Sequence, residues 1–280
     1  MSGGKLYVVA TPIGNLGDMT ARALETLRAV HTIAAEDTRR TRQLLSHFAI
    51  PAKSLVALHA HSTDGDVARI AALLEEGNDV AVVTDAGTPI VSDPGEALVR
   101  AAIAKGFTVV PIPGASAVLA ALMASGLSEN GFRFLGFLPR SGPPRHETIT
   151  RVAETPETVV LFESPNRVQD TLIDLAAIMP ARACVVAREL TKMHEETVRG
   201  TLEDLAKNER EWIGEIVLVL GAFAPDARSE NVDDAALDAK IDEELAAGGH
   251  AKSVAEKMAA WSGRPKRDVY ARVLERKRVR

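Results

Sequence analysis

Short apolar runs alternate with amphipathic stretches along the first half of the chain. Most of the apolar runs contain β-branched residues and end at glycine, proline or aspartate, which is typical of a buried strand that leads into a loop. We expect these strands at residues 6–10, 32–35, 79–84 and 108–112. Helical periodicity predicts helices at residues 20–30, 67–76 and 95–105 and from Ser116 onwards. Strands that alternate with helices indicate a mainly parallel sheet covered on both faces.

The second half of the chain alternates less regularly. Its apolar runs predict strands at residues 133–138, 158–162, 183–188 and 215–220, with helices at 166–178 and 202–208. This order favours a second α/β domain with a mixed sheet. The segment Ser141-Gly142-Pro143-Pro144 predicts a mobile loop, because glycine and proline interrupt regular structure.

The pattern divides the chain into four parts and makes it an α/β protein. We expect an N-terminal α/β domain at residues 1–122, a second α/β domain at 123–223, a polar linker at 224–234 and a helical basic tail domain at 235–280. Within the tail, an acidic helix at residues 235–247 precedes helices at 252–261 and 266–277. The tail is strongly polarised: residues 229–248 carry a net charge of −6 and residues 264–280 one of +6.

Composition bounds the class of protein and its compartment. The net charge is −5, so any RNA binding must use local basic patches. Cys184 is the only cysteine, which fits a reducing compartment, and its apolar neighbours favour a buried structural thiol. No apolar run approaches the ~20 residues of a membrane helix, and residues 1–5 lack a signal-peptide core. We expect a cytoplasmic protein without membrane contact.

Three loops rich in glycine and proline follow predicted parallel strands, at residues 11–18, 85–95 and 111–117. Ligands bind beyond the carboxyl ends of the strands in open α/β sheets, and glycine leaves backbone groups accessible to them. The dinucleotide and P-loop fingerprints are absent, which disfavours a phosphate cradle. The loops therefore predict a site for a ligand with an amino-acid moiety and an adenine ring.

Several long motifs make the chain recognisable. In chain order they are TPIGNLGD, AEDTRRTRQLL, DAGTPIVSDPG, PGASA, LFESPNR, VARELTKMHEE and GEIVLVLG. They resemble the bacterial small-subunit ribosomal RNA cytidine 2′-O-methyltransferases, which belong to the tetrapyrrole methylase superfamily. The resemblance covers about residues 5–223, with a similar helical tail. It implies S-adenosylmethionine-dependent 2′-O-methylation of a cytidine ribose in the decoding region of 16S rRNA.

The resemblance also implies a cofactor cleft between two α/β domains. Carried over to this sequence, the cofactor-binding residues are Pro12, Gly14, Asp85, Ala86, Gly87, Thr88, Ser116 and Ala117. The implied partner is 16S rRNA in the assembled small subunit, and the implied assembly is a homodimer. Where relatives carry His-x-His-Asn, this chain has His59-Ala60-His61-Ser62, so any role of that asparagine is open here.

Methyl transfer to a ribose hydroxyl is an in-line displacement at a sulfonium. Alignment of the reactants can supply most of the acceleration, and a carboxylate or histidine can accept the proton. Asp85 and Glu36 are the preferred candidates for this base, and the alternatives are Asp37, Glu163 and Glu189. No metal is required, and the sequence offers no convincing ligand cluster.

Basic side chains near the loops and in the tail are candidate RNA contacts, because arginine binds phosphate bidentately. The candidates are Arg39, Arg140, Arg145, Arg167, Arg264, Lys266 and Arg267. The competing interpretation is internal ion pairing, for example of Arg39 with Glu36, or docking of the last helix on its acidic neighbour.

Two other functions remain open. A methyltransferase of the same fold can act on a tetrapyrrole or on a protein side chain, but a small-substrate enzyme would not need the basic tail. A non-enzymatic RNA-binding module with a vestigial cleft is the second alternative, and the intact loops argue against it.

Overall fold

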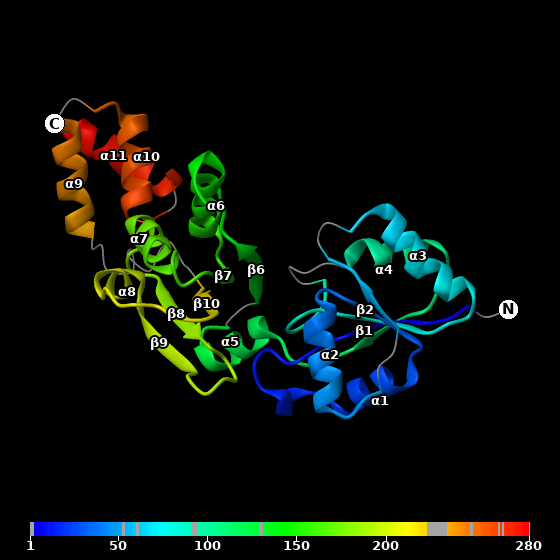
Figure 1. Ribbon diagram of the computed structural model, residues 1–280. Coiled ribbons are helices and arrows are strands. Elements are labelled where there is room, and N and C mark those ends of the chain that lie inside the picture. Colours follow the sequence, from blue (N-terminus) through cyan, green and yellow to red (C-terminus); the bar gives the residue numbers. More distant parts are fainter. Residues whose placement is uncertain are drawn as a thin grey trace.

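Two α/β domains and a bundle of helices make up the protein (Figure 1). The computed structural model describes residues 3–51, 54–59, 62–90, 95–128, 131–222, 234–246, 249–262, 264 and 266–279. Within these residues, every helix is too short or too polar to cross a membrane.

The first domain is built on a five-stranded sheet that is parallel throughout. Its strands are β1 (Leu6–Val9), β2 (Thr32–Ala35), β3 (Ser54–Ala57), β4 (Val80–Val83) and β5 (Val109–Ile112), in the order β3-β2-β4-β1-β5. The short η1 (Leu16–Asp18) precedes α1 (Ala21–Ala29), and the other helices are α2 (Thr38–His47), α3 (Asp64–Glu75) and α4 (Glu96–Ala104). Helices α1 and α2 cover one face of the sheet, and α3 and α4 the other (Figure 1). Because helices cover both faces of the sheet, the strands other than the edge strand β3 are mostly apolar in the sequence.

The second domain has the mixed sheet that the sequence predicts. Its strands are β6 (Phe132–Phe137), β7 (Thr158–Glu163), β8 (Ala183–Arg188), β9 (Glu196–Thr201) and β10 (Ile216–Leu220), in the order β6-β7-β10-β8-β9. Only β6 and β7 are parallel; the other neighbours are antiparallel. Helices α6 (Gly142–Glu154), α7 (Val168–Ile178) and α8 (Leu202–Lys207) pack on one face of this sheet.

Helix α5 (Ala117–Ser125) covers the other face of the second sheet, although it follows directly on β5 of the first. Its buried residues Val118, Ala121 and Leu122 pack with apolar residues of β7, β8 and β10. Residues 122 and 123, between which we expected the domain boundary, therefore both lie inside a helix that packs on the second domain.

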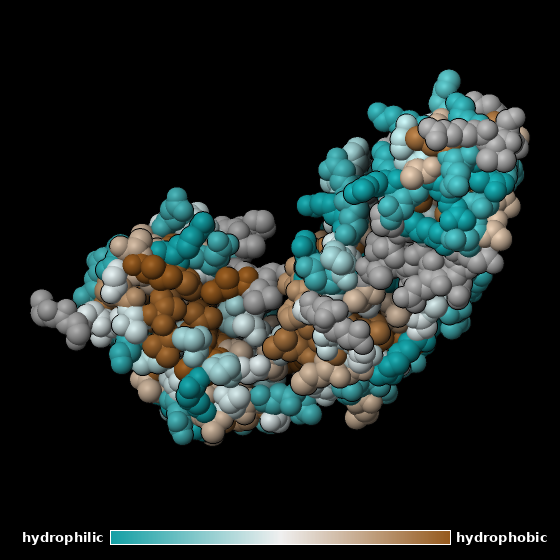
Figure 2. Space-filling model, turned by 180° about the vertical axis from the view of Figure 1, so that it is seen from behind, coloured by the Kyte–Doolittle hydropathy of each residue, from teal (hydrophilic) through white to brown (hydrophobic). Residues whose placement is uncertain are grey.

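The tail is a bundle of α9 (Asp234–Ala246), α10 (Ala251–Ser262) and α11 (Lys266–Val279). Its core contains Leu237, Ile241, Val254, Met258, Val269 and Val273. Apart from residue 234, which begins α9, the expected linker lies outside the described residues. Seen from behind, apolar surface gathers on the two α/β domains, whereas the bundle is largely hydrophilic (Figure 2).

The sequence pattern misses α2, β3, α6 and β9. Strands β3 and β9 lie at sheet edges and are only partly buried, so neither is a continuous apolar run. The prediction of a mobile loop at residues 141–144 is wrong, because Ser141 is the N-cap of α6 and Gly142 begins the helix. Proline is tolerated in a first helical turn, where its missing N–H would have no partner in any case.

Candidate active site

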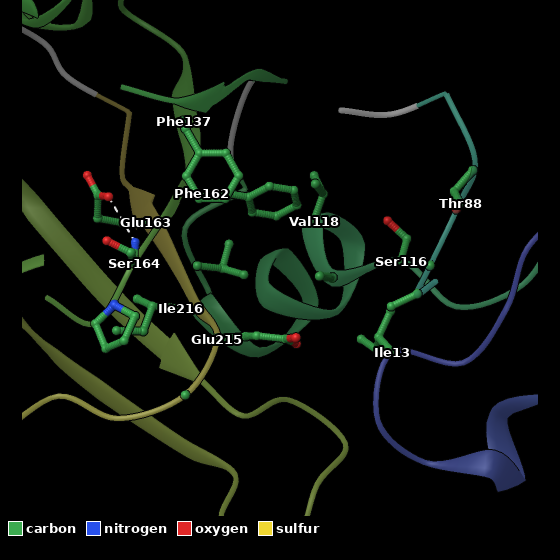
Figure 3. A pocket seen from close by; sticks show the side chains of 16 residues that line it. Ile13, Thr88, Ser116, Val118, Phe137, Phe162, Glu163, Ser164, Glu215 and Ile216 are labelled. Carbon is green, nitrogen blue, oxygen red and sulfur yellow. Dashed lines mark hydrogen bonds between the residues drawn. The ribbon is translucent and has the colours of Figure 1, made fainter. Parts of the chain in front are cut away.

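A cavity of about 400 Å³ lies between the two α/β domains (Figure 3). The first domain lines it with Ile13, Ala86, Gly87, Thr88, Ser116 and Ala117. Opposite them lie Val118, Phe137, Phe162, Glu163, Ser164, Pro165, Gly214, Glu215, Ile216 and Val217. A cavity of this size suits a small-molecule ligand.

The loops that follow β1, β4 and β5 meet at this cavity, because these strands are neighbours in the sheet. The N–H of Thr11 donates to the carbonyl of Gly87 at 2.9 Å, and the Gly87 N–H donates back at 3.0 Å. The Thr88 hydroxyl donates to the carbonyl of Ala115 at 3.2 Å. The three glycine- and proline-rich loops of the sequence are therefore one connected structure.

Gly87 keeps its backbone open toward the cavity. Its φ is +84°, a conformation that side chains disfavour. A Cβ at this position would also lie 3.2 Å from Cγ2 of Ile13. Glycine is thus required both by the conformation of the loop and by the space beside it.

The wall from the second domain combines aromatic rings with carboxylates. The rings of Phe137 and Phe162 lie 5.6 Å apart between centroids. The carboxylate of Glu163 is buried and accepts hydrogen bonds from the Ser164 N–H and the Thr171 hydroxyl, both at 2.8 Å. It also pairs with Arg167 at 3.5 Å. Glu215 supplies a second carboxylate, which pairs with Lys192 at 3.2 Å. The aromatic rings of this wall suit a ligand with a flat ring.

A second cavity, of about 520 Å³, adjoins the first and shares Ile13 and Ala86 with it. Its other lining residues are Thr11, Pro12, Gly14, Leu16, Arg40, Thr41, Gln43, Leu44, His47, Thr84 and Asp85. All of these belong to the first domain. The two cavities are therefore neighbours, with Ile13 and Ala86 at their boundary.

Asp85 and Glu36, the two candidate bases, are hydrogen-bonded into one cluster beside this boundary. Glu36 accepts hydrogen bonds from the Thr84 hydroxyl at 2.6 Å and from the Asp85 N–H at 3.2 Å. The Asp85 carboxylate pairs with Arg40 at 3.2 Å. Burial and the negative charge of Glu36 raise the pKa of Asp85 above its usual value. A raised pKa makes this carboxylate a better proton acceptor.

Asp37 is a poor base by comparison. It caps α2, and its ion pair with Arg39 at 2.8 Å lowers the pKa of its carboxyl to about 2. The partner of Arg39 is therefore Asp37 rather than Glu36. The Arg39 side chain is still 83% exposed, so it stays accessible to RNA.

The structure divides the expected cofactor residues between the two cavities. Ala86, Gly87, Thr88, Ser116 and Ala117 line the first, whereas Pro12, Gly14 and Asp85 line the second. Of the wall from the second domain, the sequence analysis named only Glu163 as a candidate site residue, as an alternative base. In the sequence, the wall residues Phe137, Phe162 and Ile216 look like core residues. Only the polar segment that follows β7 indicates that this part of the second domain lines a site.

Comparison with known proteins decides the family. The family model for Tetrapyrrole (Corrin/Porphyrin) Methylases matches residues 5–206. The chain belongs to this methylase family. The methylase is 44% identical over 272 residues to the ribosomal RNA small subunit methyltransferase I of Xylella fastidiosa (strain Temecula1), which covers 95% of this chain and 98% of that protein. It is 39% identical over 276 residues to the protein of the same name from Bacillus subtilis (strain 168), with 95% and 93% covered.

Solved structures confirm the fold of the methylase. A diphthine synthase superposes with a TM-score of 0.61 at 20% identity, covering 78% of this chain and 90% of that one. A uroporphyrin-III C-methyl transferase from Thermus thermophilus, complexed with S-adenyl homocysteine, has a TM-score of 0.55 at 19% identity, with 78% and 97% covered.

Three candidate RNA-binding arginines line another cavity of the methylase, beside the start of α6. Arg167 donates to the carbonyls of Leu138 and Pro139, and Arg145 pairs with Asp174 at 2.7 Å. The Arg145 side chain is only 11% exposed. Arg140 is exposed and has no hydrogen-bond or ion-pair partner among the residues that the structure describes. Arg145 and Arg167 thus shape the loop that presents Arg140.

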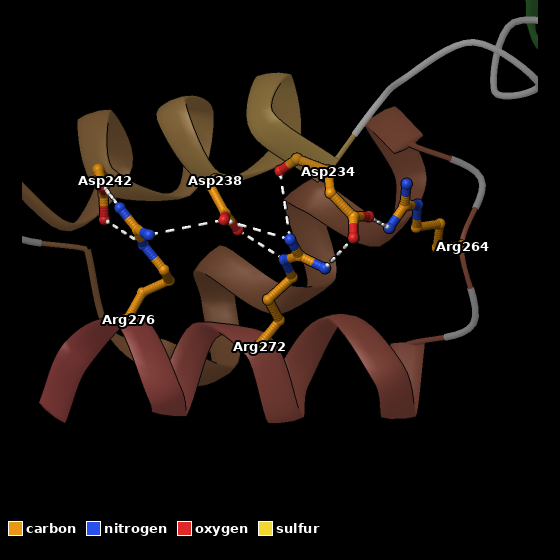
Figure 4. A network of polar contacts seen from close by, with 6 residues as sticks. All are labelled: Asp234, Asp238, Asp242, Arg264, Arg272 and Arg276. Atoms are coloured by element: carbon orange, nitrogen blue, oxygen red, sulfur yellow. Dashed lines mark hydrogen bonds and ion pairs between the residues drawn. The ribbon is translucent and has the colours of Figure 1, made fainter. Parts of the chain in front are cut away.

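In the tail, arginines of the basic segment pair with the acidic helix (Figure 4). Arg264 contacts Asp234, Arg272 contacts Asp234 and Asp238, and Arg276 contacts Asp238 and Asp242. These three arginines therefore form internal ion pairs with the acidic helix, as the competing interpretation of the sequence predicts. Lys266 and Arg267, the other candidates, are exposed.

The remaining sequence expectations concern metal and cysteine chemistry. Among the described residues, no group of three or more His, Cys, Asp or Glu side chains could hold a metal ion. Cys184 is buried, and burial raises the pKa of its thiol to about 12. Such a thiol stays protonated and packs as an apolar group.

Proposed function

We propose that the cavity between the domains binds S-adenosylmethionine. The observation that carries this proposal is the meeting of three glycine-containing loops with a wall of aromatic rings and carboxylates. The backbone around Gly87 would meet the polar groups of the cofactor, and Phe137 and Phe162 would meet its adenine ring. The bound cofactor supplies an electrophilic methyl group.

The proposed acceptor is the 2′-hydroxyl of a cytidine in the decoding region of 16S rRNA, within the assembled small subunit. Its support is similarity over nearly the full length to proteins named ribosomal RNA small subunit methyltransferase I. Relatives of known structure act on other molecules but are only about a fifth identical, so they speak for the fold alone.

In the proposed mechanism, the two cavities hold the reactants in line, which supplies most of the acceleration. Asp85 would accept the hydroxyl proton while the hydroxyl oxygen takes the methyl group from the cofactor's sulfonium, whose S–CH3 bond breaks to leave S-adenosylhomocysteine. Glu36 holds the Asp85 backbone through its hydrogen bond and keeps the Asp85 pKa raised through its charge. Arg40 balances the charge of the pair.

RNA binding would use the accessible basic groups around the cavities. Arg39 and Arg140 are exposed, and Arg145 and Arg167 line the same cavity as Arg140. In the tail, the exposed Arg267 is a better candidate than Arg264, which pairs with Asp234, and Lys266 is exposed as well.

We also propose a cytoplasmic homodimer. Apolar side chains are exposed on α5 and on the edge strand β6, including Leu119, Met123 and Phe132. Large exposed apolar patches mark association sites in soluble proteins. Sedimentation of the purified protein would give its mass in solution.

The decisive test is methylation of small ribosomal subunits by the purified protein, followed by mapping of the modified nucleotide. A methyl group on a cytidine ribose in the decoding region is the expected result. Calorimetry with S-adenosylhomocysteine tests the cofactor site separately. Methylation of a uroporphyrinogen and not of subunits would instead establish the tetrapyrrole alternative.

A further inference from the structure

The cavity beside the start of α6, called the outer cavity below, has a volume of about 520 Å³ and is lined by residues of the second domain alone. Its lining includes three guanidinium groups, those of Arg140, Arg145 and Arg167, and two carboxylates, those of Asp170 and Asp174. Arg145 and Asp174 pair with each other at 2.7 Å. The formal charge of the lining is therefore positive, which favours an anion.

Two of these guanidinium groups have N–H donors to spare. Arg140 is exposed and has no partner among the described residues. Arg167 contacts the carbonyls of Leu138 and Pro139 and the carboxylate of Glu163 through Nη2, so within the described residues its Nε and Nη1 groups have no acceptor. Guanidinium N–H groups match the oxygens of a phosphate in geometry and charge. The outer cavity can therefore hold a phosphate between Arg140 and Arg167.

Arg145 and Arg167 also converge on one buried carboxylate, that of Glu163, which lies in the wall of the first cavity (Figure 3). Nη2 of Arg145 donates to the Thr171 hydroxyl at 3.0 Å, and this hydroxyl donates to Oε2 of Glu163 at 2.8 Å. Nη2 of Arg167 lies 3.5 Å from the same oxygen. The side chain of Glu163 is 0% exposed, so water screens its interactions weakly. A change of charge beside Arg167 is therefore felt at the wall of the first cavity.

Resting on the proposed function, we propose that the outer cavity binds a phosphodiester group of the substrate RNA and that its occupancy strengthens cofactor binding. In the free protein, Arg167 offsets the negative charge of Glu163. A phosphate between Arg140 and Arg167 offsets the charge of Arg167 in turn, so the first cavity becomes more negative. S-adenosylmethionine carries a positive sulfonium and gains from this change, whereas S-adenosylhomocysteine lacks that charge and gains little.

This coupling gives the protein different affinities for RNA before and after methyl transfer. Coupling between two binding sites is reciprocal, so S-adenosylmethionine strengthens RNA binding by the same factor by which RNA strengthens cofactor binding. Methyl transfer removes the sulfonium charge. RNA is therefore held more tightly before the transfer than after it, which favours release of the methylated product.

The test measures Kd for S-adenosylmethionine by calorimetry at rising concentrations of inorganic phosphate, with sodium chloride adjusted to keep the ionic strength constant. We expect saturating phosphate to lower this Kd about fivefold, at the lower end of typical coupling between sites. Kd for S-adenosylhomocysteine should stay almost unchanged. A short single-stranded oligoribonucleotide should have the same effect at a lower concentration, because each strand offers several phosphates.

Four variants separate binding of the anion from its coupling to the cofactor. Arg140→Gln removes a donor group and should lose the response to phosphate. Glu163→Gln removes the charge that couples the cavities, so phosphorus NMR should still detect phosphate binding while Kd for S-adenosylmethionine no longer responds. Asp170→Asn removes a negative charge from the lining, so the half-maximal response should need less phosphate. The control Arg151→Gln replaces an exposed arginine of α6 that does not line the cavity, and it should match the wild type.

The proposal is overturned if phosphate leaves the wild-type Kd for S-adenosylmethionine unchanged, or if the response survives in Arg140→Gln or Glu163→Gln. An equal response of S-adenosylhomocysteine would also overturn it, because the coupling would then not depend on charge. An oligoribonucleotide without effect would show that the outer cavity does not take RNA. Failure of the proposed function itself looks different, since the protein would then bind no S-adenosylmethionine or methylate no ribosomal RNA at any phosphate concentration.

Discussion

The side chain of Lys192, from the second domain, lies across the α-carbon of Gly14 in the first. A Cβ on Gly14 would be 2.4 Å from Cγ of Lys192 and 2.9 Å from its Cε. The Lys192 ammonium donates to Glu189 at 2.8 Å and to Glu215 at 3.2 Å. Burial opposes the charge of Lys192, but these two hydrogen bonds raise its pKa, so the ammonium stays charged. Glu215 lines the first cavity and Gly14 the second, so this contact joins the domains where the cavities meet.

Gly14→Ala should displace Lys192 and loosen this junction. A misplacement of about 1 Å can cost up to about 100-fold in rate, so we expect kcat/KM to fall by at least about tenfold. The fold should survive, because Lys192 can swing toward solvent. Gly65→Ala is the control, since a Cβ there would meet only the Thr63 hydroxyl at 3.5 Å. Steady-state kinetics that are equal for both variants would show that the contact does not align the reactants.

Gly87→Val should abolish cofactor binding. It adds a side chain to a residue with φ of +84° and crowds Ile13 at the cavity wall. The control Gly77→Val carries the same backbone strain, with φ of +86°, but has nothing within 4 Å. Both variants lose roughly 1–2 kcal/mol of stability to the strain. Only Gly87→Val should lose the rise in Tm that S-adenosylhomocysteine causes. At a ligand concentration of 100 times Kd, binding adds about 2.7 kcal/mol to the free energy of unfolding.

Asp85→Asn should lower turnover without weakening cofactor affinity. An amide cannot accept the hydroxyl proton, and general-base catalysis contributes roughly 100-fold or more. Single-turnover rates give the loss, and calorimetry with S-adenosylhomocysteine gives the affinity. Full activity of Asp85→Asn would leave alignment alone as the source of catalysis.

The pH profile should carry the signature of the raised Asp85 pKa. The base is active when ionised, so activity is present above this pKa and is lost as the pH falls through it, above the ~3.9 of an ordinary aspartate. Glu36→Gln removes a charge that raises the pKa, so the acid limb of kcat should move to lower pH. Arg40→Ala removes a charge that lowers it, so the limb should move to higher pH. If both substitutions move the acid limb of kcat in the same direction, the limb reflects the titration of a group other than Asp85.

We expect the tail to bind RNA through exposed basic side chains, including those of Lys266 and Arg267. Replacing both Lys266 and Arg267 by alanine should weaken binding to small subunits and make its log–log salt dependence shallower by about 0.7 to 0.9 for each phosphate that is no longer bound. Arg272→Ala, which breaks pairs with Asp234 and Asp238, should mainly destabilise the bundle. Deletion of residues 229–280 should weaken RNA binding and spare cofactor binding. An unchanged affinity and salt slope after deletion would show that the tail does not hold RNA.

The amino-acid sequence alone predicted four of the five strands of each sheet, the parallel and mixed character of the two sheets, and the three loops of the site. Strands that are buried on both faces are largely apolar, and a loop at a ligand site needs a residue such as Gly87, so both leave a local signal. The edge strand β9 leaves none, because most of its residues are polar and all of them are at least partly exposed.

The three-dimensional arrangement was needed to show which sheet α5 covers, which residues of the second domain face Gly87, and which partners the tail arginines take. These outcomes depend on contacts between residues far apart in the chain. Arg264 is a candidate phosphate-binding residue in the sequence, yet it pairs with Asp234, which lies 30 residues away in α9. A guanidinium binds carboxylate and phosphate with the same geometry, so the fold, and not the residue type, decides which of them it meets.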